Sequence, residues 1–447
     1  EIRSALTENA EKQAISLFGR NLRQLLLIPP LAGHTVLGLD PGYRTGCKAA
    51  IVNPQGTVLA TTVFYLTHSE SQRQSAAKQM LELIRRHQVS LAAIGNGTAS
   101  YETEEFLAGL IRDHELTLHY VIANEAGASV YSASKLAKDE LPDLDVSLRG
   151  AVSIARRVQD PLAELVKIEP KAIGVGQYQH DVDQKELLQA LDGVVESAVN
   201  HVGVDLNSAS VELLRHVAGI QGPVAKNIVA WRDANGRFSR RKELLKIPRL
   251  GPAAFVQCAG FLRVADATDP LDNTPVHPES YALAEALLER LGFKKADLRS
   301  REKLSQLQTA IQSIDAAALA AELGAGEPTL RDILSALVKP GRDPREDLPL
   351  PVTRKNIVKL DDLLPGAIVK GTVHNVTDFG AFVDIGVKIN GLLHRSELSN
   401  KPFRHPLDIV SGGDVIDVMI LNVDASRNRI GLSLKQAQKT QSLSAGK

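Results

Sequence analysis

The sequence predicts a multi-domain chain that combines an α/β domain with a mixed sheet, an all-α region and an all-β barrel. Two changes in apolar periodicity indicate this order, and 447 residues exceed what one core accommodates. The expected parts are a residual helical segment (1–32), the α/β domain (33–165), a connector (166–186), paired helical hairpins (187–265), a linker with a helical connector (266–350), the barrel (351–437) and a tail (438–447).

Composition narrows the class of protein. The 52 basic and 52 acidic residues balance, so a uniformly basic surface is excluded and charge has to be considered segment by segment. Two distant cysteines, Cys47 and Cys258, argue against a disulfide framework or structural zinc and favour a reducing, cytoplasmic compartment. No apolar run is long enough to span a membrane. Because the chain starts at Glu1 without a signal peptide, we expect a piece of a longer protein.

The α/β domain is expected from three consecutive strands followed by helices that alternate with strands. "TVLGLD", "CKAAIVN" and "TVLATTVFYL" are β-branched runs separated by tight turns, and "LAAIGNG" and "LHYVIANE" come between helical stretches. Such alternation predicts a mixed sheet with helices on both faces. The preceding helix is expected to stop at Pro29 and Pro30.

Three carboxylates of this domain are candidate catalytic residues. Asp40 ends the first strand, the usual place for a catalytic carboxylate in an open sheet, Glu125 ends "VIANE", and Asp160 lies in "RRVQDPLAEL". Carboxylates gathered around a divalent metal support attack on a phosphodiester, so Mg²⁺ is expected only if the domain is a nuclease. Ordinary turn chemistry explains "DPG" at residue 40, and a helix start explains "DP" at residue 160.

The strand order and lengths resemble the RNase-H-like fold of the YqgF group, relatives of Holliday-junction resolvases. "IGNGTAS" has Asn96 near the place where resolvases use an acid, so we expect a scaffold or binding domain without catalysis. "DPGYRTG" also resembles the phosphate turn of actin-like kinases, but a matching second lobe is missing from the sequence.

The connector contains a polar cluster in "GVGQYQHDVDQ". Tyr178, His180, Asp181 and Asp183 are close in sequence and could ligate a metal. Loop polarity and helix capping explain the same residues equally well.

Two glycine turns, "GIQGP" and "RLGP", each separate apolar segments with helical spacing. Glycine lacks a Cβ, so Gly219, Gly222 and Gly251 would let a phosphate approach the amides of the turn. The helix N-terminus that follows adds free N–H groups and a partial positive charge. Such a turn is suited to contacting phosphate backbone without reading bases.

Local charge agrees with this interpretation, because ten basic residues and four acidic ones lie between His201 and Ala265. The basic residues are Arg215, Lys226, Arg232, Arg237, Arg240, Arg241, Lys242, Lys246, Arg249 and Arg263. The segment resembles the tandem helix-hairpin-helix domain of DNA-uptake and repair proteins, through "VDLNSAS" and the pattern around "GIQG". We assign Lys226 and Arg249 to phosphate binding. A hairpin that packs only against protein is the alternative.

The stretch "ATDPLDNTPVHPES" (267–280) is rich in Pro, Asp and Thr and is predicted to be a linker. Short alternating strands follow a further helical block and predict a C-terminal barrel. Because Phe382 precedes the apolar Val383, one of the two has to face outward on a regular strand. An exposed ring near basic residues is a stacking platform for single-stranded bases. The basic residues are Lys370, Arg404, Arg427 and Arg429.

The barrel segment resembles the S1-type RNA-binding domain, an OB-fold, over essentially its whole length. The resemblance implies that Phe379, Phe382, His394, Asp424 and Arg429 face RNA. A barrel retained for docking to protein is the alternative.

The order of these parts, together with "GVGQYQHDV" and "QDPLAELV", resembles the Tex family of bacterial transcription accessory proteins, relatives of a eukaryotic transcription elongation factor. The resemblance implies a cytoplasmic, non-enzymatic protein that binds single-stranded RNA or DNA, with RNA polymerase or the ribosome as protein partner. It also implies that this chain lacks most of the family's N-terminal helical region. A metal-dependent nuclease and a ribosome-associated translation factor remain the alternatives.

Overall fold

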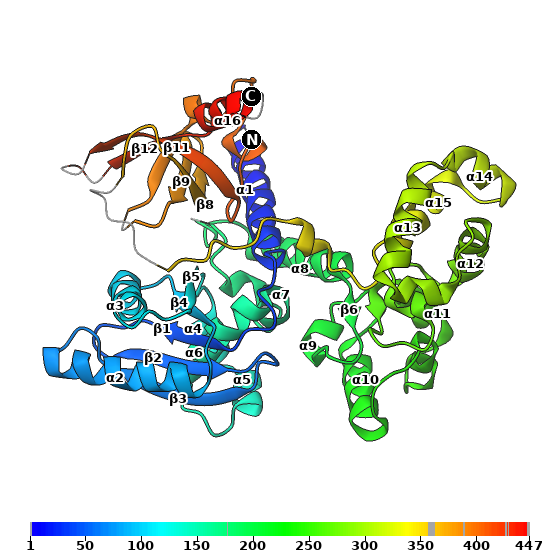
Figure 1. Ribbon diagram of the computed structural model, residues 1–447, viewed down its shortest axis with the longest axis horizontal. Helices are drawn as coiled ribbons and strands as arrows, with labels where there is room; N and C mark the ends of the chain where they lie inside the picture. The colour runs from blue at the N-terminus through cyan, green and yellow to red at the C-terminus, as the bar shows by residue number, and fades with distance from the viewer. Residues whose placement is uncertain are drawn as a thin grey trace. The chain divides into compact units, whose positions relative to one another are not determined.

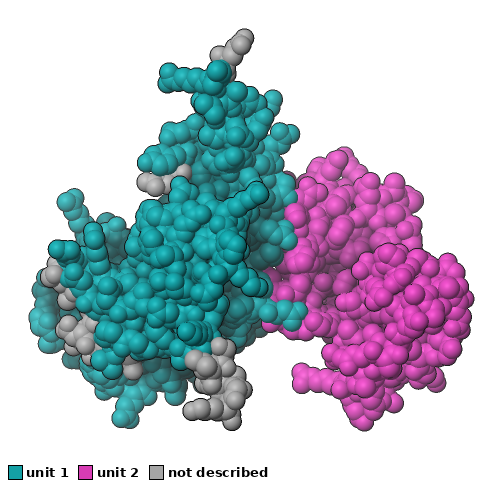
Figure 2. Space-filling view, turned by 90° about the horizontal axis from the view of Figure 1, so that it is seen from above, with its two compact units in different colours: residues 1–194, 347–447 teal, residues 195–346 magenta. Residues whose placement is uncertain are grey.

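The computed structural model describes residues 2–176, 178–355, 363–387, 389–424, 427 and 429–444. The chain divides into unit 1, residues 1–194 and 347–447, and unit 2, residues 195–346 (Figure 2). The predicted combination of a mixed α/β sheet, a helical region and a barrel is confirmed. Within the described ranges, no helix has both the length and the apolar character of a membrane span.

A five-stranded sheet with the order β3-β2-β1-β4-β5 follows helix α1 (Ile2–Leu26) in unit 1 (Figure 1). The strands are β1 (Val36–Asp40), β2 (Cys47–Val52), β3 (Val58–Phe64), β4 (Leu91–Gly95) and β5 (His119–Ala123). The first three form an antiparallel meander, whereas β4 runs parallel to both β1 and β5. The carboxyl ends of β1, β4 and β5 therefore meet at one edge of the sheet.

Helices cover both faces of this sheet. They are α2 (Glu70–Arg86), α3 (Ser100–Asp113), α4 (Ala128–Ala133), α5 (Lys135–Glu140), α6 (Val146–Gln159) and α7 (Pro161–Leu165). Helix α6 packs closely because Gly38 has no side chain: a Cβ there would lie 2.2 Å from the carbonyl oxygen of Ala151. Helices α4 and α5 are separated by Ser134, whose hydroxyl accepts a hydrogen bond from the amide of Ala137 and caps α5.

The barrel of unit 1 is closed, with the strand order β10-β12-β11-β8-β9. Its strands are β8 (Ile368–Thr377), β9 (Gly380–Asp384), β10 (Gly391–His394), β11 (Val415–Asp424) and β12 (Arg429–Ser433). Helix α16 (Leu434–Ser444) follows the last strand. The prediction of a tail from residue 438 is therefore wrong for residues 438–444, which are helical. Residues 445–447 lie outside the described residues.

Arg354 connects the barrel to the sheet within unit 1. Its amide donates to the carbonyl of Tyr120 at 2.8 Å and its carbonyl accepts from the amide of Tyr120 at 2.9 Å. The guanidinium lies 3.2 Å from Glu104 of α3 and 2.8 Å from Asp384 of β9. Since the guanidinium is largely buried, these two carboxylates compensate its loss of hydration.

Unit 2 is helical apart from a short parallel pair, β6 (Val204–Asp205) and β7 (Leu262–Arg263). Its helices are α8 (Gln184–Val202), which enters from unit 1, α9 (Val211–Leu214), α10 (Gly222–Asn235), the 3₁₀ helix η2 (Arg241–Lys246), α11 (Pro252–Cys258), α12 (Tyr281–Arg290), α13 (Arg301–Gln312), α14 (Ala316–Glu322) and α15 (Glu327–Leu337). The last four pack around one core that includes Leu287, Leu307 and Leu330.

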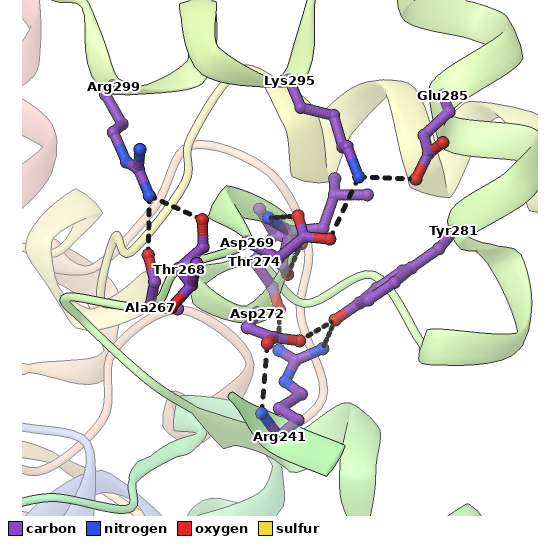
Figure 3. A network of polar contacts seen from close by, with 11 residues as sticks. Arg241, Ala267, Thr268, Asp269, Asp272, Thr274, Tyr281, Glu285, Lys295 and Arg299 are labelled. Carbon is purple, nitrogen blue, oxygen red and sulfur yellow. Dashed lines mark hydrogen bonds and ion pairs between the residues drawn. The ribbon is translucent and has the colours of Figure 1, made fainter. Parts of the chain in front are cut away.

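The stretch predicted to be a linker is instead packed into unit 2 at five positions and takes part in a network of polar contacts (Figure 3). The five buried residues are Ala267, Leu271, Asp272, Thr274 and Val276. Arg241 is completely buried, and its side chain donates to the carbonyls of Leu262 at 2.6 Å, Val276 at 2.7 Å and Thr274. The hydroxyl of Tyr281 accepts from Arg241 at 2.9 Å and donates to Asp272 at 2.7 Å.

The linker prediction is therefore wrong for this stretch. The carbonyls of Thr274 and Val276 accept from the buried guanidinium, and Asp272 accepts from the backbone amide of Arg241. Pro270 and Pro278 start 3₁₀ turns, so the polar composition serves an interior network.

We expect Arg241→Ala to destabilise unit 2 by about 3–5 kcal/mol, because it leaves the carbonyls of Thr274 and Val276 buried without their donor and removes the positive charge beside Asp272. Hydrogen exchange of the amides over 201–281 measures this loss locally. The exposed neighbour Lys242 is the matched control, and Lys242→Ala should leave the exchange almost unchanged. Equal protection in both variants would contradict a structural role for the buried guanidinium.

Candidate nucleic-acid interface

The aromatic ring of Phe382 lies on the outer surface of the barrel. Its neighbours on β9, Ala381 and Val383, are fully buried, whereas Phe382 is only half-buried. Successive side chains of a strand point to opposite faces, so the buried pair places the phenyl ring outside. The expectation that one of Phe382 and Val383 faces outward is fulfilled by Phe382.

Strand register surrounds this ring with other outward-facing residues. Phe382 lies opposite Leu392 of β10 and Asn375 of β8. Leu392 pairs with Gly431 of β12, whose amide donates to the side chain of Asn422 on β11 at 3.0 Å. Leu392, Asn375 and Asn422 were not singled out from the sequence, because the residues beside Phe382 are known only once the strand register is known.

Phe379 lies in the turn between β8 and β9, with half of its surface exposed. Its ring meets that of Phe382 edge-to-face, with centroids 6.1 Å apart. The turn is tight because Gly380 has a φ of 153° and no room for a side chain: a Cβ would lie 2.3 Å from the carbonyl oxygen of Leu393. The two rings thus present adjoining aromatic surface to solvent.

The other three residues implied by the resemblance also lie on the surface of the barrel. His394 is exposed opposite Gly380, at the Phe379 end of β10. Asp424 and Arg429 pair with each other at the far end of β11 and β12. The antiparallel pairing of β9 with β10 and the parallel pairing of β10 with β12 place Phe382 between these ends. RNA contact by these five residues stays a prediction.

The first hairpin turn of unit 2 shows a different role for Gly219 from the one expected. Gly219 has a φ of 81°, and a Cβ there would lie 2.8 Å from Gln257 Cβ and 3.1 Å from the carbonyl oxygen of Ala254. The packing of α11 therefore requires this glycine. Gly222 and Gly251, in contrast, have no atom within 4 Å of an added Cβ, so a phosphate has room at both.

The two turns have the same backbone hydrogen bonding, but the "GP" of the first turn does not correspond to the "GP" of the second. Gln221 precedes helix α10 where Gly251 precedes helix α11, so the correspondence is shifted by one residue. Ile220 donates its amide to Val217 in the first turn, and Leu250 donates to Ile247 in the second. The residue before each of these donors has positive φ, and in the second turn it is Arg249, with φ 68°. A non-glycine residue in this region stores strain, which is often found at functional sites.

Only part of the basic segment is available to a ligand. Besides Arg241, Arg232 donates to the carbonyls of Leu206 and Ala209, and Arg263 donates to the carbonyl of Arg342. The count of ten cations therefore overestimated the surface charge. Lys226, in the first turns of α10, and Arg249 are exposed.

Asp40 and Glu125 lie close together at the carboxyl edge of the sheet, and both are partly buried. A Cβ on Gly97 would lie 1.8 Å from Glu125 Oε1, and one on Gly150 would lie 2.8 Å from Asp40 Oδ2. Burial raises the pKa of both carboxyls, and the charge of Asp40 raises that of Glu125 further. Among the described residues, Glu125 Oε2 is buried without a hydrogen-bond partner.

Asp160 does not join this pair, and its grouping with Asp40 and Glu125 is wrong. Gly150 of α6 lies at Asp40, but Gln159, at the other end of α6, donates to the carbonyl of His34 before β1. Gly150 and Gln159 are nine residues apart on the helix, which corresponds to about 14 Å along its axis. Asp160 caps α7 by accepting from the amide of Ala163 at 3.3 Å, so the helix-start explanation applies.

The connector cluster behaves as a capped loop. Asp183 accepts from the amides of Lys185 at 2.9 Å and Glu186 at 2.8 Å, at the start of α8. Tyr178 and His180 are exposed. In the part of the chain that the structure describes, no three His, Cys, Asp or Glu side chains are grouped so as to hold a metal ion.

Comparison with family models matches four segments of the chain. They are a "Tex protein YqgF-like domain" at 34–159, a "Helix-hairpin-helix motif" at 199–263, an "HHH domain" at 269–345 and an "S1 RNA binding domain" at 363–435. The domain types stated as resemblances are thereby confirmed. The helical block after residue 266, expected only as a connector, is matched as an HHH domain.

Curated relatives match almost the whole chain. It is 52% identical over 434 residues to "Uncharacterized protein YdcI" of Bacillus subtilis, covering 97% of this chain and 60% of that protein. It is 50% identical over 437 residues to "Transcriptional accessory protein Tex" of Neisseria gonorrhoeae, covering 97% and 56%. "Protein YhgF" of Escherichia coli is 50% identical over 436 residues, with 97% and 55% covered. The chain spans little more than half the length of these relatives.

We expect Asp40→Asn to raise the melting temperature of unit 1, and to raise it more at pH 8 than at pH 4. A carboxyl whose pKa is raised by folding contributes stability at low pH that is lost as the pH rises through the folded-state pKa. Replacing it by a neutral amide removes that loss. Calorimetry at the two pH values tests this, with the exposed Asp143→Asn as control. Destabilisation by Asp40→Asn at pH 8 would contradict it.

Proposed function

Since this chain belongs to the Tex family of transcription accessory proteins, we propose that it binds single-stranded nucleic acid through the outer face of its barrel. The observation that carries this proposal is the pair of solvent-facing rings of Phe379 and Phe382. Each base stacked on an aromatic side chain contributes roughly 1–3 kcal/mol, with little dependence on sequence. We therefore expect binding that tolerates many sequences.

We propose that the hairpins of unit 2 add contacts to the phosphate backbone. Open space at Gly222 and Gly251 and the exposed charges of Lys226 and Arg249 support this proposal. Helix α10 starts at Gly222 without a side-chain cap, so its first amides are free to bind an anion. Pro223 removes one of these donors, which leaves the amides of Gly222 and Val224.

The setting of this binding is transcription, in keeping with the name of the Neisseria relative. We propose RNA polymerase as the protein partner and the cytoplasm as the location; the two unpaired, buried cysteines fit a reducing compartment. Co-sedimentation of the chain with RNA polymerase and with ribosomes distinguishes this partner from a translational one.

We propose that the α/β domain has no nuclease activity. The Asp40–Glu125 pair lacks Asp160 as a third carboxylate. A panel of branched, single-stranded and duplex substrates with Mg²⁺ or Mn²⁺ tests this, and cleavage that disappears in Asp40→Asn would contradict it.

Replacing both Phe379 and Phe382 by alanine should weaken binding to single-stranded RNA by about tenfold or more, because two stacking surfaces are removed. A fluorescence titration with a short uridine-rich oligonucleotide measures the change. Tyr65, exposed on the α/β domain, offers a matched control: Tyr65→Ala should bind as tightly as the unmodified chain. A double variant with unchanged affinity would remove the barrel from the proposal.

Arg249→Gly should separate stability from binding. A non-glycine residue in the left-handed conformation of Arg249 costs roughly 1–2 kcal/mol, and glycine avoids this cost. We therefore expect the free energy of unfolding to stay the same or to rise. Loss of one phosphate contact should lower affinity and reduce the slope of log K against log salt by about 1. Lys303→Ala, on the exposed side of α13, is the charge-matched control. An unchanged slope would show that Arg249 is not in contact with phosphate.

A further inference from the structure

We propose that His405 and Asp378 are positioning residues for the stacking ring of Phe379, an inference that rests on the proposed binding of bases by the barrel. Asp378 immediately precedes Phe379 in the turn between β8 and β9. His405 lies in the long connection between β10 and β11. The Nε2 of His405 lies 2.9 Å from Asp378 Oδ1 and connects the two segments.

The proton of this contact can be placed from its surroundings. The amide of Leu407 donates to His405 Nδ1 at 3.1 Å, so Nδ1 is an acceptor. In the neutral imidazole the hydrogen is then on Nε2, which donates to the carboxylate of Asp378. One histidine thereby caps its own short helix and holds the neighbouring turn.

The segment that carries His405 is itself anchored. The amides of Arg404 and His405 donate to Asp408 Oδ2 at 3.1 and 2.9 Å, and these bonds hold the pKa of Asp408 below its usual value. The guanidinium of Arg395 donates to the carbonyl of Arg404 at 2.7 Å and lies over the ring of Phe403. His405 therefore projects from a fixed loop.

Arg395 also completes the connection to Phe379. Its backbone amide donates to the carbonyl of Phe379 at 2.8 Å. The contacts form a closed circuit, which we name the Phe379 clamp: Asp378, Phe379, Arg395, Arg404 and His405. Gly380, which has no space for a side chain, fixes the other side of the turn.

The exposure of Asp378 indicates what the clamp does. Its side chain is 94% exposed, and an exposed ion pair contributes about 0–1 kcal/mol to stability. Its effect on the fold is therefore small. A ring that is already ordered loses less entropy when a base stacks on it, so the clamp acts on affinity through preorganisation.

A direct contact of His405 with phosphate is the competing explanation. The two explanations predict opposite changes in affinity when the carboxylate of Asp378 is removed. If His405 only supplies charge, removing the nearby carboxylate should strengthen binding of a polyanion. If the clamp positions Phe379, Asp378→Ala should weaken binding despite the lost negative charge. Asp378→Asn keeps an oxygen that accepts from Nε2, so it should retain most of the affinity.

The experiment measures affinity for a uridine-rich single-stranded RNA with the full chain. His405→Asn keeps an oxygen that can accept from the amide of Leu407 but is too short to reach Asp378. We expect His405→Asn and Asp378→Ala each to weaken binding about two- to fivefold, which is the range that the strength of an exposed ion pair allows. In a Phe379→Ala background, neither should have a further effect, because the ring they position is absent.

Three results would overturn the proposal: full affinity of His405→Asn while Phe379→Ala is impaired, tighter binding by Asp378→Ala, or undiminished effects in the Phe379→Ala background. Each leaves base stacking by the barrel intact. Unchanged affinity of the Phe379 and Phe382 double variant is the separate result that removes stacking itself, and the clamp with it.

Discussion

The closed ring of hydrogen-bonded barrel strands is the constraint on which the whole interface depends. Because each strand pairs on both sides, a slip of one residue would turn the core side chains of that strand outward. Ala381 and Val383 are buried on β9, so the ring of Phe382 has no alternative to the outer surface. The same register brings Leu392 beside it. The residues on the outer face of the barrel are thus determined by which side chains of the same strands are packed in its core.

Unit 2 depends in a similar way on the buried positive charge of Arg241. Arg241 joins the segment that begins the second hairpin to the stretch 272–281, and several of its partners are backbone carbonyls. The network holds η2, which leads directly into the turn at Arg249. A buried cation therefore supports the place where an exposed cation is presented, with the strain at Arg249 sustained by the surrounding fold.

Local patterns were sufficient to predict the strands, the order of the domains and the fact that either Phe382 or Val383 faces outward, because alternation and turn residues depend on near neighbours in the sequence; the choice of Phe382 came from the resemblance to S1-type domains. Long-range contacts were not accessible. Asp160 was grouped with Asp40 although α6 carries it to the other end of β1, and the stretch 267–280 was taken for a linker because its partner, Arg241, is distant in sequence. Gly219 was assigned to a phosphate, whereas the packing of α11 requires it.

The roles proposed for the barrel and the hairpins are chemically complementary, since rings suit bases whereas amides and cations suit phosphates. The central claim is that bases lie on the two phenyl rings. Photo-crosslinking with thiouridine-labelled RNA, followed by peptide mapping, tests it most directly. We expect crosslinks at Phe379 and Phe382 or in the strand segments beside them. Crosslinks confined to other surfaces, with the outer face of the barrel unmodified, would contradict it.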